Sequence, residues 1–374
     1  MNVEMRTLTN IMDYVTWRGD LRFTQDPPNA LDALVFASLS YLRLCGDDET
    51  QTNAPISLKE VAQAFQHQEN SAKAVHLELL EAAARSERFG NVSVLHYREK
   101  FLPEQDTQFA AVTFRLDDGS LFIAFRGTDS TLVGWKEDFS MCFRQTVPAQ
   151  CRALEYTCEI ANRYSAPLYL CGHSKGGNMA VFAAARSSPL HQEKICGVYN
   201  FDGPGFSDYM MGDVGYLAMV PKIHTYVPQS SVIGMIMDRE EPVSIVHSSA
   251  SGIWQHDTYS WDVVGKHFVS VEETTVDSKF MKQTIKNWLA SMNSEERGCM
   301  VETLFDLLTT GDVDELSDIL SIKTLRSYLK VIGDDDATRR VLVADLLALF
   351  TAAKQAAHQL GEHQNEHEKL RELK

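Results

Sequence analysis

Residues 168–185 have the sequence Leu-Tyr-Leu-Cys-Gly-His-Ser-Lys-Gly-Gly-Asn-Met-Ala-Val-Phe-Ala-Ala-Ala. A short apolar run precedes a Gly-x-Ser-x-Gly turn at residues 172–176, and an Ala-rich segment typical of a helix follows. This order of strand, tight turn and helix is that of a nucleophile elbow, in which a strained serine is raised above the strand ends to meet a substrate. A serine between two glycines also occurs in ordinary turns, but here the flanking strand and helix are both present. We therefore predict that Ser174 is a nucleophile and that the backbone N–H of Lys175 contributes to an oxyanion hole.

The segments around the elbow predict an α/β fold. Apolar strands alternate with helices, which favours a mainly parallel sheet covered on both faces. The expected class is an α/β-hydrolase fold with a helical N-terminal region and a small all-helical C-terminal extension. Besides the elbow strand, we expect strands over residues 109–115, 121–125, 194–201, 222–227 and 243–246, and helices over residues 30–44, 71–88, 148–164 and 276–292.

The chain is expected to divide into three parts. Residues 1–293 form the hydrolase domain, and residues 1–90 are its largely helical N-terminal part. Ser57 and Glu60 fit a capping box at the start of one helix there, because each side chain can satisfy a free backbone N–H. Residues 294–354 are expected to form a helical bundle, and residues 355–374 a charged tail.

Composition narrows the possible partners. With 44% hydrophobic residues, the 374-residue chain can bury a sizeable core, and its net charge of −16 disfavours nucleic acid as a partner. No apolar run approaches the ~20 residues of a membrane span, and no secretory signal is evident at the N-terminus. The seven cysteines include no Cys-x-x-Cys pair, which favours reduced thiols in a cytoplasmic protein over disulfides or a zinc site. We expect no metal and no organic cofactor.

A nucleophilic serine needs a base, and the base needs a carboxylate that fixes its tautomer. In this fold the chain order is serine, acid, histidine. His256 is the preferred base, because it follows the last expected core strand in a segment of aromatic and polar residues; His247 is the alternative. Asp202 is the preferred acid, because it ends the first strand after the elbow and so projects from the same edge of the sheet as Ser174. Asp238 and Asp257 are the alternative acids.

A second oxyanion donor is expected before the elbow. The sequence Arg126-Gly127-Thr128 follows a buried strand and precedes a polar loop, so its backbone N–H groups could stabilise charge that develops in the transition state.

These motifs resemble those of class 3 lipases. The resemblance rests on Phe125-Arg126-Gly127-Thr128, Gly134-Trp135-x-x-Asp138 and the elbow at residues 172–177. By this resemblance Thr128 and the Lys175 amide form the oxyanion hole, Ser174 is the nucleophile, and His256 is the triad histidine. The acid departs from the lipase pattern, because the lipase aspartate would fall near the uncharged Ser230. Asp202 is instead similar in position to the acid of the pancreatic lipase group.

The span from about residue 10 to residue 297 more closely resembles the Mbeg-like family of bacterial lipase-like proteins, a domain of unknown function. The motifs that carry this resemblance, besides the elbow, are Tyr14-x-x-Trp17-Arg18-Gly19-Asp20, Asn200-Phe201-Asp202-Gly203-Pro204-Gly205, Val227-Pro228-Gln229-Ser230-Ser231 and Gln255-His256-Asp257-x-Tyr259-Ser260-Trp261.

The sequence thus predicts a serine hydrolase that cleaves carboxylic esters, with a small-molecule or lipid ester as substrate. The apolar stretches 216–220 and 232–237 could accept an acyl chain. Two alternatives remain at this point. One is a hydrolase-fold scaffold without catalysis that binds a protein partner through its C-terminal helices, and the other is a thioesterase or acyltransferase that uses the same triad.

Overall fold

A computed structural model describes residues 9–45, 55–65, 74–102, 107–128, 140–141, 144–231, 233–291, 293 and 295–298. The expected helical bundle over 294–354 and the charged tail over 355–374 therefore lie almost entirely outside the described residues. None of the helices within these ranges is long and apolar enough to cross a membrane.

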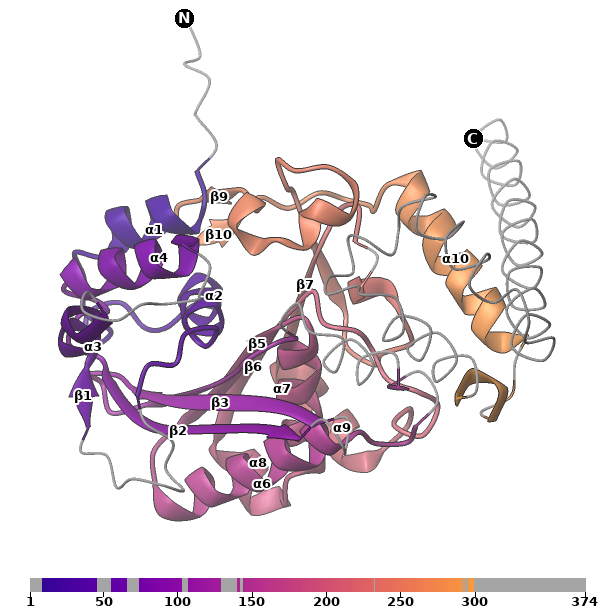
Figure 1. The fold of residues 1–374 in the computed structure, drawn as a ribbon, viewed down its shortest axis with the longest axis horizontal. Coiled ribbons are helices and arrows are strands. Elements are labelled where there is room, and N and C mark those ends of the chain that lie inside the picture. The colour runs from indigo at the N-terminus through magenta and orange to yellow at the C-terminus, as the bar shows by residue number, and fades with distance from the viewer. Residues whose placement is uncertain are drawn as a thin grey trace, which may run out of the picture.

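The core of the molecule is an eight-stranded sheet whose strands lie side by side in the order of the sequence (Figure 1). The first four strands pair antiparallel, and every pair from β4 to β8 is parallel. The strands are β1 (Ile56–Ser57), β2 (Ser93–Leu102), β3 (Thr107–Arg115), β4 (Leu121–Phe125), β5 (Leu168–His173), β6 (Ile195–Phe201), β7 (Ile223–Pro228) and β8 (Val243–Val246). A small hairpin of β9 (Val263–Val264) and β10 (His267–Phe268) follows. This arrangement confirms the expected α/β-hydrolase class, with a mainly parallel central sheet.

Helices cover both faces of the sheet, as the alternation of strands and helices predicted (Figure 1). The N-terminal helices lie on one face, where α2 packs against β4, β5 and β6, and α6, α7 and α9 lie on the other. The helices are α1 (Ile11–Arg18), α2 (Ala30–Leu39), α3 (Leu58–Phe65), α4 (Ala74–Arg85), α6 (Pro148–Arg163), α7 (Lys175–Arg186), α8 (Pro189–Lys194), α9 (Val214–Met219) and α10 (Val276–Ala290).

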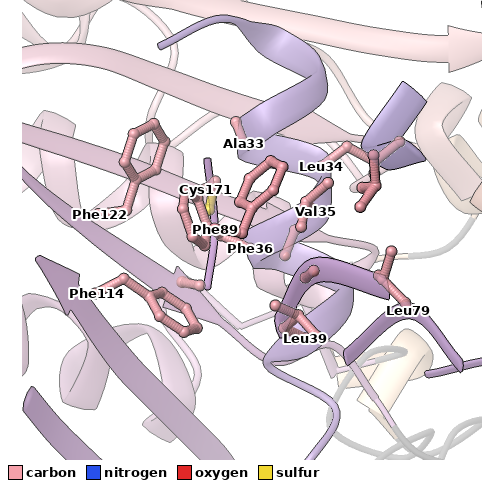
Figure 2. Packing of buried hydrophobic residues seen from close by; sticks show 14 of the residues in the cluster. Ala33, Leu34, Val35, Phe36, Leu39, Leu79, Phe89, Phe114, Phe122 and Cys171 are labelled. Carbon is pink, nitrogen blue, oxygen red and sulfur yellow. The ribbon is translucent and has the colours of Figure 1, made fainter. Parts of the chain in front are cut away.

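Strand β4 shows how one strand supplies two cores. Phe122 and Ala124 pack with the N-terminal helices, whereas Leu121, Ile123 and Phe125 pack with α6 and α7. Figure 2 shows the first of these cores, in which the ring of Phe36 from α2 lies 4.9 Å from that of Phe122. A strand that is buried on both faces in this way is apolar along its whole length, and for this reason residues 121–125 could be recognised in the sequence.

One expected helix differs from the observed one. The helix expected over 30–44 ends at Leu39, where the Ser40 hydroxyl bonds the carbonyl of Ala37 and the chain turns away. The capping box at Ser57 and Glu60 is present and starts α3. Strand β2 and helix α1 had no sequence prediction, because β2 carries three consecutive charged residues and α1 has only two turns with a weak apolar face.

A fully buried ion pair joins the N-terminal helices. The Arg88 guanidinium donates to both carboxylate oxygens of Asp32, at 2.7 and 2.6 Å, and neither side chain is exposed to solvent. Arg88 also donates to the backbone carbonyls of Leu21 and Asp26, and Tyr14 donates to Asp32. The charges are therefore satisfied on all sides, which offsets the cost of removing them from water.

We predict that Arg88→Ala lowers the free energy of unfolding by about 3–5 kcal/mol, because it leaves the Asp32 carboxylate buried without its partner. Arg22→Ala is the matched control, because its ion pair with Glu87 is more than half exposed. It should cost less than about 1 kcal/mol. Urea denaturation measures both. Equal losses in the two variants would contradict the structural role of the Arg88 pair.

Candidate active site

Ser174 lies at the turn between β5 and α7 in a backbone conformation that non-glycine residues rarely adopt. Its φ is 57° and its ψ −132°, and it is the N-cap residue of α7. Such strain persists only where the surroundings impose it, and it is frequent at functional sites. The Ser174 N–H donates to the Phe201 carbonyl at 2.9 Å, which ties the turn to the end of the neighbouring strand β6. The expected elbow is therefore present, with the helix and the strand on the expected sides.

The glycines of the elbow allow neighbouring backbone segments to approach it closely. A Cβ at Gly172 would lie 2.2 Å from backbone atoms of Gly176, and one at Gly176 would lie 2.2 Å from the Phe125 carbonyl oxygen. A Cβ at Gly177 would meet the side-chain oxygen of Asn200 at 2.1 Å. Each glycine is thus required by a different close approach. Gly172 is close to another residue of the elbow, Gly176 to strand β4, and Gly177 to strand β6.

Asp202 follows β6 directly and lies at the same edge of the sheet as Ser174. It is almost fully buried and has a positive φ of 51°, a conformation that Asp tolerates better than most residues. One carboxylate oxygen, Oδ2, lies 2.7 Å from Nδ1 of His256. The other, Oδ1, accepts hydrogen bonds from the Ser231 hydroxyl at 2.5 Å and from the Gly234 N–H at 3.2 Å.

His256 is the last residue of a short helical turn, residues 252–256. Because an ionised carboxylate can only accept, the bond to Asp202 assigns the proton of the neutral imidazole to Nδ1 and leaves Nε2 as an acceptor. The ring lies beside the elbow, since its centroid is 4.4 Å from that of His173, the residue before Ser174. The expected histidine and the expected acid are thus brought together next to the expected nucleophile.

The alternative residues lie elsewhere. His247 pairs with Asp262 rather than with Asp202. Asp238 forms an exposed pair with Lys286, and Asp257 caps the next short helical turn by accepting from the Tyr259 N–H. Asp202 is the only one of the three candidate acids with a bond to His256.

Gly127 and Thr128 bring the end of β4 to the elbow. A Cβ at Gly127 would lie 2.6 Å from the His173 carbonyl oxygen and 3.2 Å from the Ser174 Cβ, so this backbone runs directly past Ser174. Lys175 begins α7, and its side chain is buried. The backbone at Gly127 and the first residue of α7 therefore both lie beside Ser174.

Several residues of the sequence motifs hold these loops in place. The Asn178 amide in α7 donates to the carbonyls of Pro204 and Gly205, and it accepts from Gln150. The Gln255 side chain accepts from the Ser230 N–H. This bond ties the segment that carries His256, here called the histidine loop, to the chain just after β7. Asn178 and Gln255 could be noticed in the sequence because they belong to the quoted motifs, but no sequence pattern indicates which groups they bind.

Ser231 is the main residue that sequence reasoning missed. Its hydroxyl donates to Asp202 and accepts from the Gly234 N–H at 3.1 Å, so it fixes the carboxylate from the side opposite His256. It lies next to Ser230, where the lipase pattern would place its own acid. Nothing in the sequence around Ser231 indicates that its hydroxyl would bind a carboxylate 29 positions earlier in the chain.

The apolar stretch over residues 216–220 was expected to accept an acyl chain, and this expectation is wrong for its two largest buried residues. Tyr216 and Met219 lie in the core between α9 and α7. The Tyr216 hydroxyl donates to the buried Glu241. Among the residues that the structure describes, no group of three or more His, Cys, Asp or Glu side chains is arranged to hold a metal ion.

A family model and several solved structures are similar to this chain. The model of the family described as Mbeg1-like matches residues 83–306, more than half of the chain. No curated protein sequence matches.

Solved structures that are similar to the chain include a Rhizomucor miehei lipase in a propeptide complex (13% identity, 57% of this chain and 67% of that one, TM-score 0.36). Two others are a fungal lipase in an inhibitor complex (12%, 59% and 80%, TM-score 0.39) and M37 lipase (14%, 56% and 70%, TM-score 0.38).

We predict that Gly234→Ala disrupts the pair of Asp202 and His256, because the added Cβ would lie 2.2 Å from the Asp202 Oδ1 atom. The low-field proton resonance of His256 Nδ1–H should broaden or vanish in the NMR spectrum. Gly197→Ala in β6 is the control, since its Cβ would only touch side-chain atoms at 3.3 Å or more. A sharp, unshifted resonance in Gly234→Ala would contradict the tight packing against Asp202.

Proposed function

The chain belongs to the Mbeg1-like family, and we propose that it is a serine hydrolase that cleaves carboxylic esters through a covalent acyl-enzyme. The observation that carries this proposal is the hydrogen bond between His256 Nδ1 and Asp202 Oδ2, formed beside a strained serine at the neighbouring strand end. A buried carboxylate, an imidazole with a free Nε2 and a serine in an elbow are the three parts of a serine hydrolase site.

In this proposal Ser174 Oγ attacks the ester carbonyl carbon while His256 Nε2 takes the hydroxyl proton. The tetrahedral intermediate collapses when the C–O bond breaks, and His256 returns the proton to the departing alcohol. Water then attacks the acyl-enzyme, again with His256 as base, and releases the carboxylic acid and the free serine. Asp202 holds the imidazole in the Nδ1–H tautomer and stabilises the imidazolium that forms in each half of the reaction.

The oxyanion that forms on the carbonyl oxygen would be stabilised by the Lys175 backbone N–H and by Thr128. Donors that are fixed before the reaction act most strongly in a site with little water, because they need no reorganisation as the charge appears. The crowding at Gly127 supports this role, since it holds the chain before Thr128 against the elbow.

A thioesterase or an acyltransferase would form the same acyl-enzyme and differ only in the leaving group or the acceptor. A fluorophosphonate probe tests for the reactive serine in all three cases, because it reacts with the activated hydroxyl and needs no acceptor. Screening esters and thioesters of increasing chain length then separates these substrate classes.

The probe should label the wild-type protein and should not label Ser174→Ala. Ester hydrolysis should fall by a factor on the order of 10⁶ in Ser174→Ala and in His256→Ala, and by about 10⁴ in Asp202→Asn. His247→Ala is the control, because its partner is Asp262 and it should keep full activity. If the folded wild-type protein is not labelled, or if Ser174→Ala is still labelled, the proposed site is wrong.

The side chain of Thr128 is tested separately. If its hydroxyl donates to the oxyanion, Thr128→Val should lower kcat by about 10²–10³ with little change in KM, and Thr128→Ser should keep most of the activity. A Val variant with wild-type kcat would restrict the contribution of Thr128 to its backbone N–H.

A further inference from the structure

A chain of hydrogen bonds runs from the N-terminal helices to the backbone of the histidine loop. The hydroxyl of Tyr41, two residues after the end of α2, lies 2.9 Å from Nδ1 of His173. On the other side of the same ring, Nε2 of His173 lies 2.8 Å from the backbone carbonyl oxygen of His256. His173 therefore bridges Tyr41 and the backbone of the proposed base.

The chemistry of the partners assigns the protons along this chain. A carbonyl oxygen only accepts, so His173 must carry a hydrogen on Nε2. In the neutral imidazole Nδ1 is then an acceptor, and the Tyr41 hydroxyl donates to it. Every bond in the chain is satisfied when His173 is uncharged.

An uncharged His173 suits its position. Its ring centroid lies 4.4 Å from that of His256, which becomes an imidazolium during each half of the proposed reaction. A second positive charge at this distance would oppose that step, because like charges that are close together raise each other's energy. The bond from the Tyr41 hydroxyl is compatible with the uncharged form, whose Nδ1 lone pair accepts it.

A second link holds the same loop three residues further on. The His76 ring of α4 is stacked on that of Tyr41, with the centroids 5.1 Å apart, and Nδ1 of His76 lies 2.9 Å from the Tyr259 hydroxyl. Burial raises the pKa of Tyr259 above its ordinary value, so the hydroxyl keeps its proton and can donate. The loop from His256 to Tyr259 is thus held at both ends by residues from one aromatic cluster.

We propose that Tyr41 and His173 are positioning residues that hold the backbone of His256, so that its imidazole faces Ser174 in the geometry that proton transfer needs. This inference rests on the proposed function. It assigns a role to the N-terminal helical layer, because Tyr41 and His76 both precede residue 83, where the match to the family begins.

The test compares Tyr41→Phe, His173→Leu and His173→Gln in the full-length protein. Tyr41→Phe keeps the ring that stacks on His76 and removes only the hydroxyl. His173→Leu removes both bonds, whereas His173→Gln can restore them, since its amide N–H can donate to the His256 carbonyl and its amide oxygen can accept from Tyr41. Tyr164→Phe is the matched control, because the Tyr164 hydroxyl bonds His96 Nε2 at 2.8 Å near the opposite end of β5.

With p-nitrophenyl butyrate as the probe substrate, kcat should fall on the order of tenfold in Tyr41→Phe and about 100-fold in His173→Leu, with KM changed less than about twofold. His173→Gln should recover most of kcat, and Tyr164→Phe should keep it. Fluorophosphonate labelling should slow in parallel but still reach completion, because Ser174 is intact. Wild-type kcat in Tyr41→Phe, or no recovery in His173→Gln relative to His173→Leu, would overturn the proposal.

The Nδ1–H resonance of His256 separates this proposal from the proposed function. It should broaden in Tyr41→Phe and His173→Leu and stay sharp in His173→Gln and Tyr164→Phe, whether or not the ester is hydrolysed. An inactive wild-type protein with this pattern would refute the hydrolase function and leave the positioning chain standing. A sharp resonance in both Tyr41→Phe and His173→Leu would refute the positioning chain alone.

Discussion

The crowding around the turn at Ser174 is the constraint on which the rest of the site depends. Two backbone segments approach the elbow so closely that a Cβ at Gly176 or Gly203 would lie 2.2 or 2.5 Å from a neighbouring atom, and a Cβ at Gly172 would lie 2.2 Å from Gly176 within the elbow itself. The serine at the centre has a backbone conformation that costs about 1–3 kcal/mol and is maintained by these contacts. Strand β4, strand β6 and helix α7 are thereby fixed relative to the turn at Ser174. Residues of the site follow β4 and β6 and begin α7.

The position of the proposed base, His256, depends on a different part of the chain. His256 lies on a loop without strand pairing of its own, so its orientation depends on side chains that reach it from elsewhere. Asp202 bonds its ring, His173 bonds its carbonyl, and the neighbouring Gln255 side chain accepts from the Ser230 N–H. The N-terminal helices contribute through Tyr41, and the buried pair of Arg88 and Asp32 holds those helices together. A helical layer remote in sequence from the elbow is thus connected to the loop of the base.

Much of this architecture could be predicted from the sequence because its signals are local. The elbow is a contiguous motif, β4 is apolar throughout because it is buried on both faces, and Asp202 lies at the end of a strand next to the elbow strand. Strand β2 escaped prediction because Arg98, Glu99 and Lys100 interrupt its apolar pattern. Tyr41 and Ser231 escaped for another reason: each acts through a partner more than 25 positions away, and no local pattern records such a pairing.

The proposed acid illustrates why the position of one residue can vary while the geometry of a site is preserved. An imidazole needs only an oriented acceptor at Nδ1, and the carboxyl ends of β6 and β7 are adjacent because these strands pair in parallel. Either strand end can therefore supply the carboxylate to the same histidine. In this chain β6 supplies it as Asp202, and the segment after β7 supplies Ser231, whose hydroxyl donates to that carboxylate. Ser230, the position at which the lipase pattern would carry its acid, is thus the neighbour of Ser231, which orients Asp202. The absence of a charge at Ser230 is therefore no evidence against a complete site.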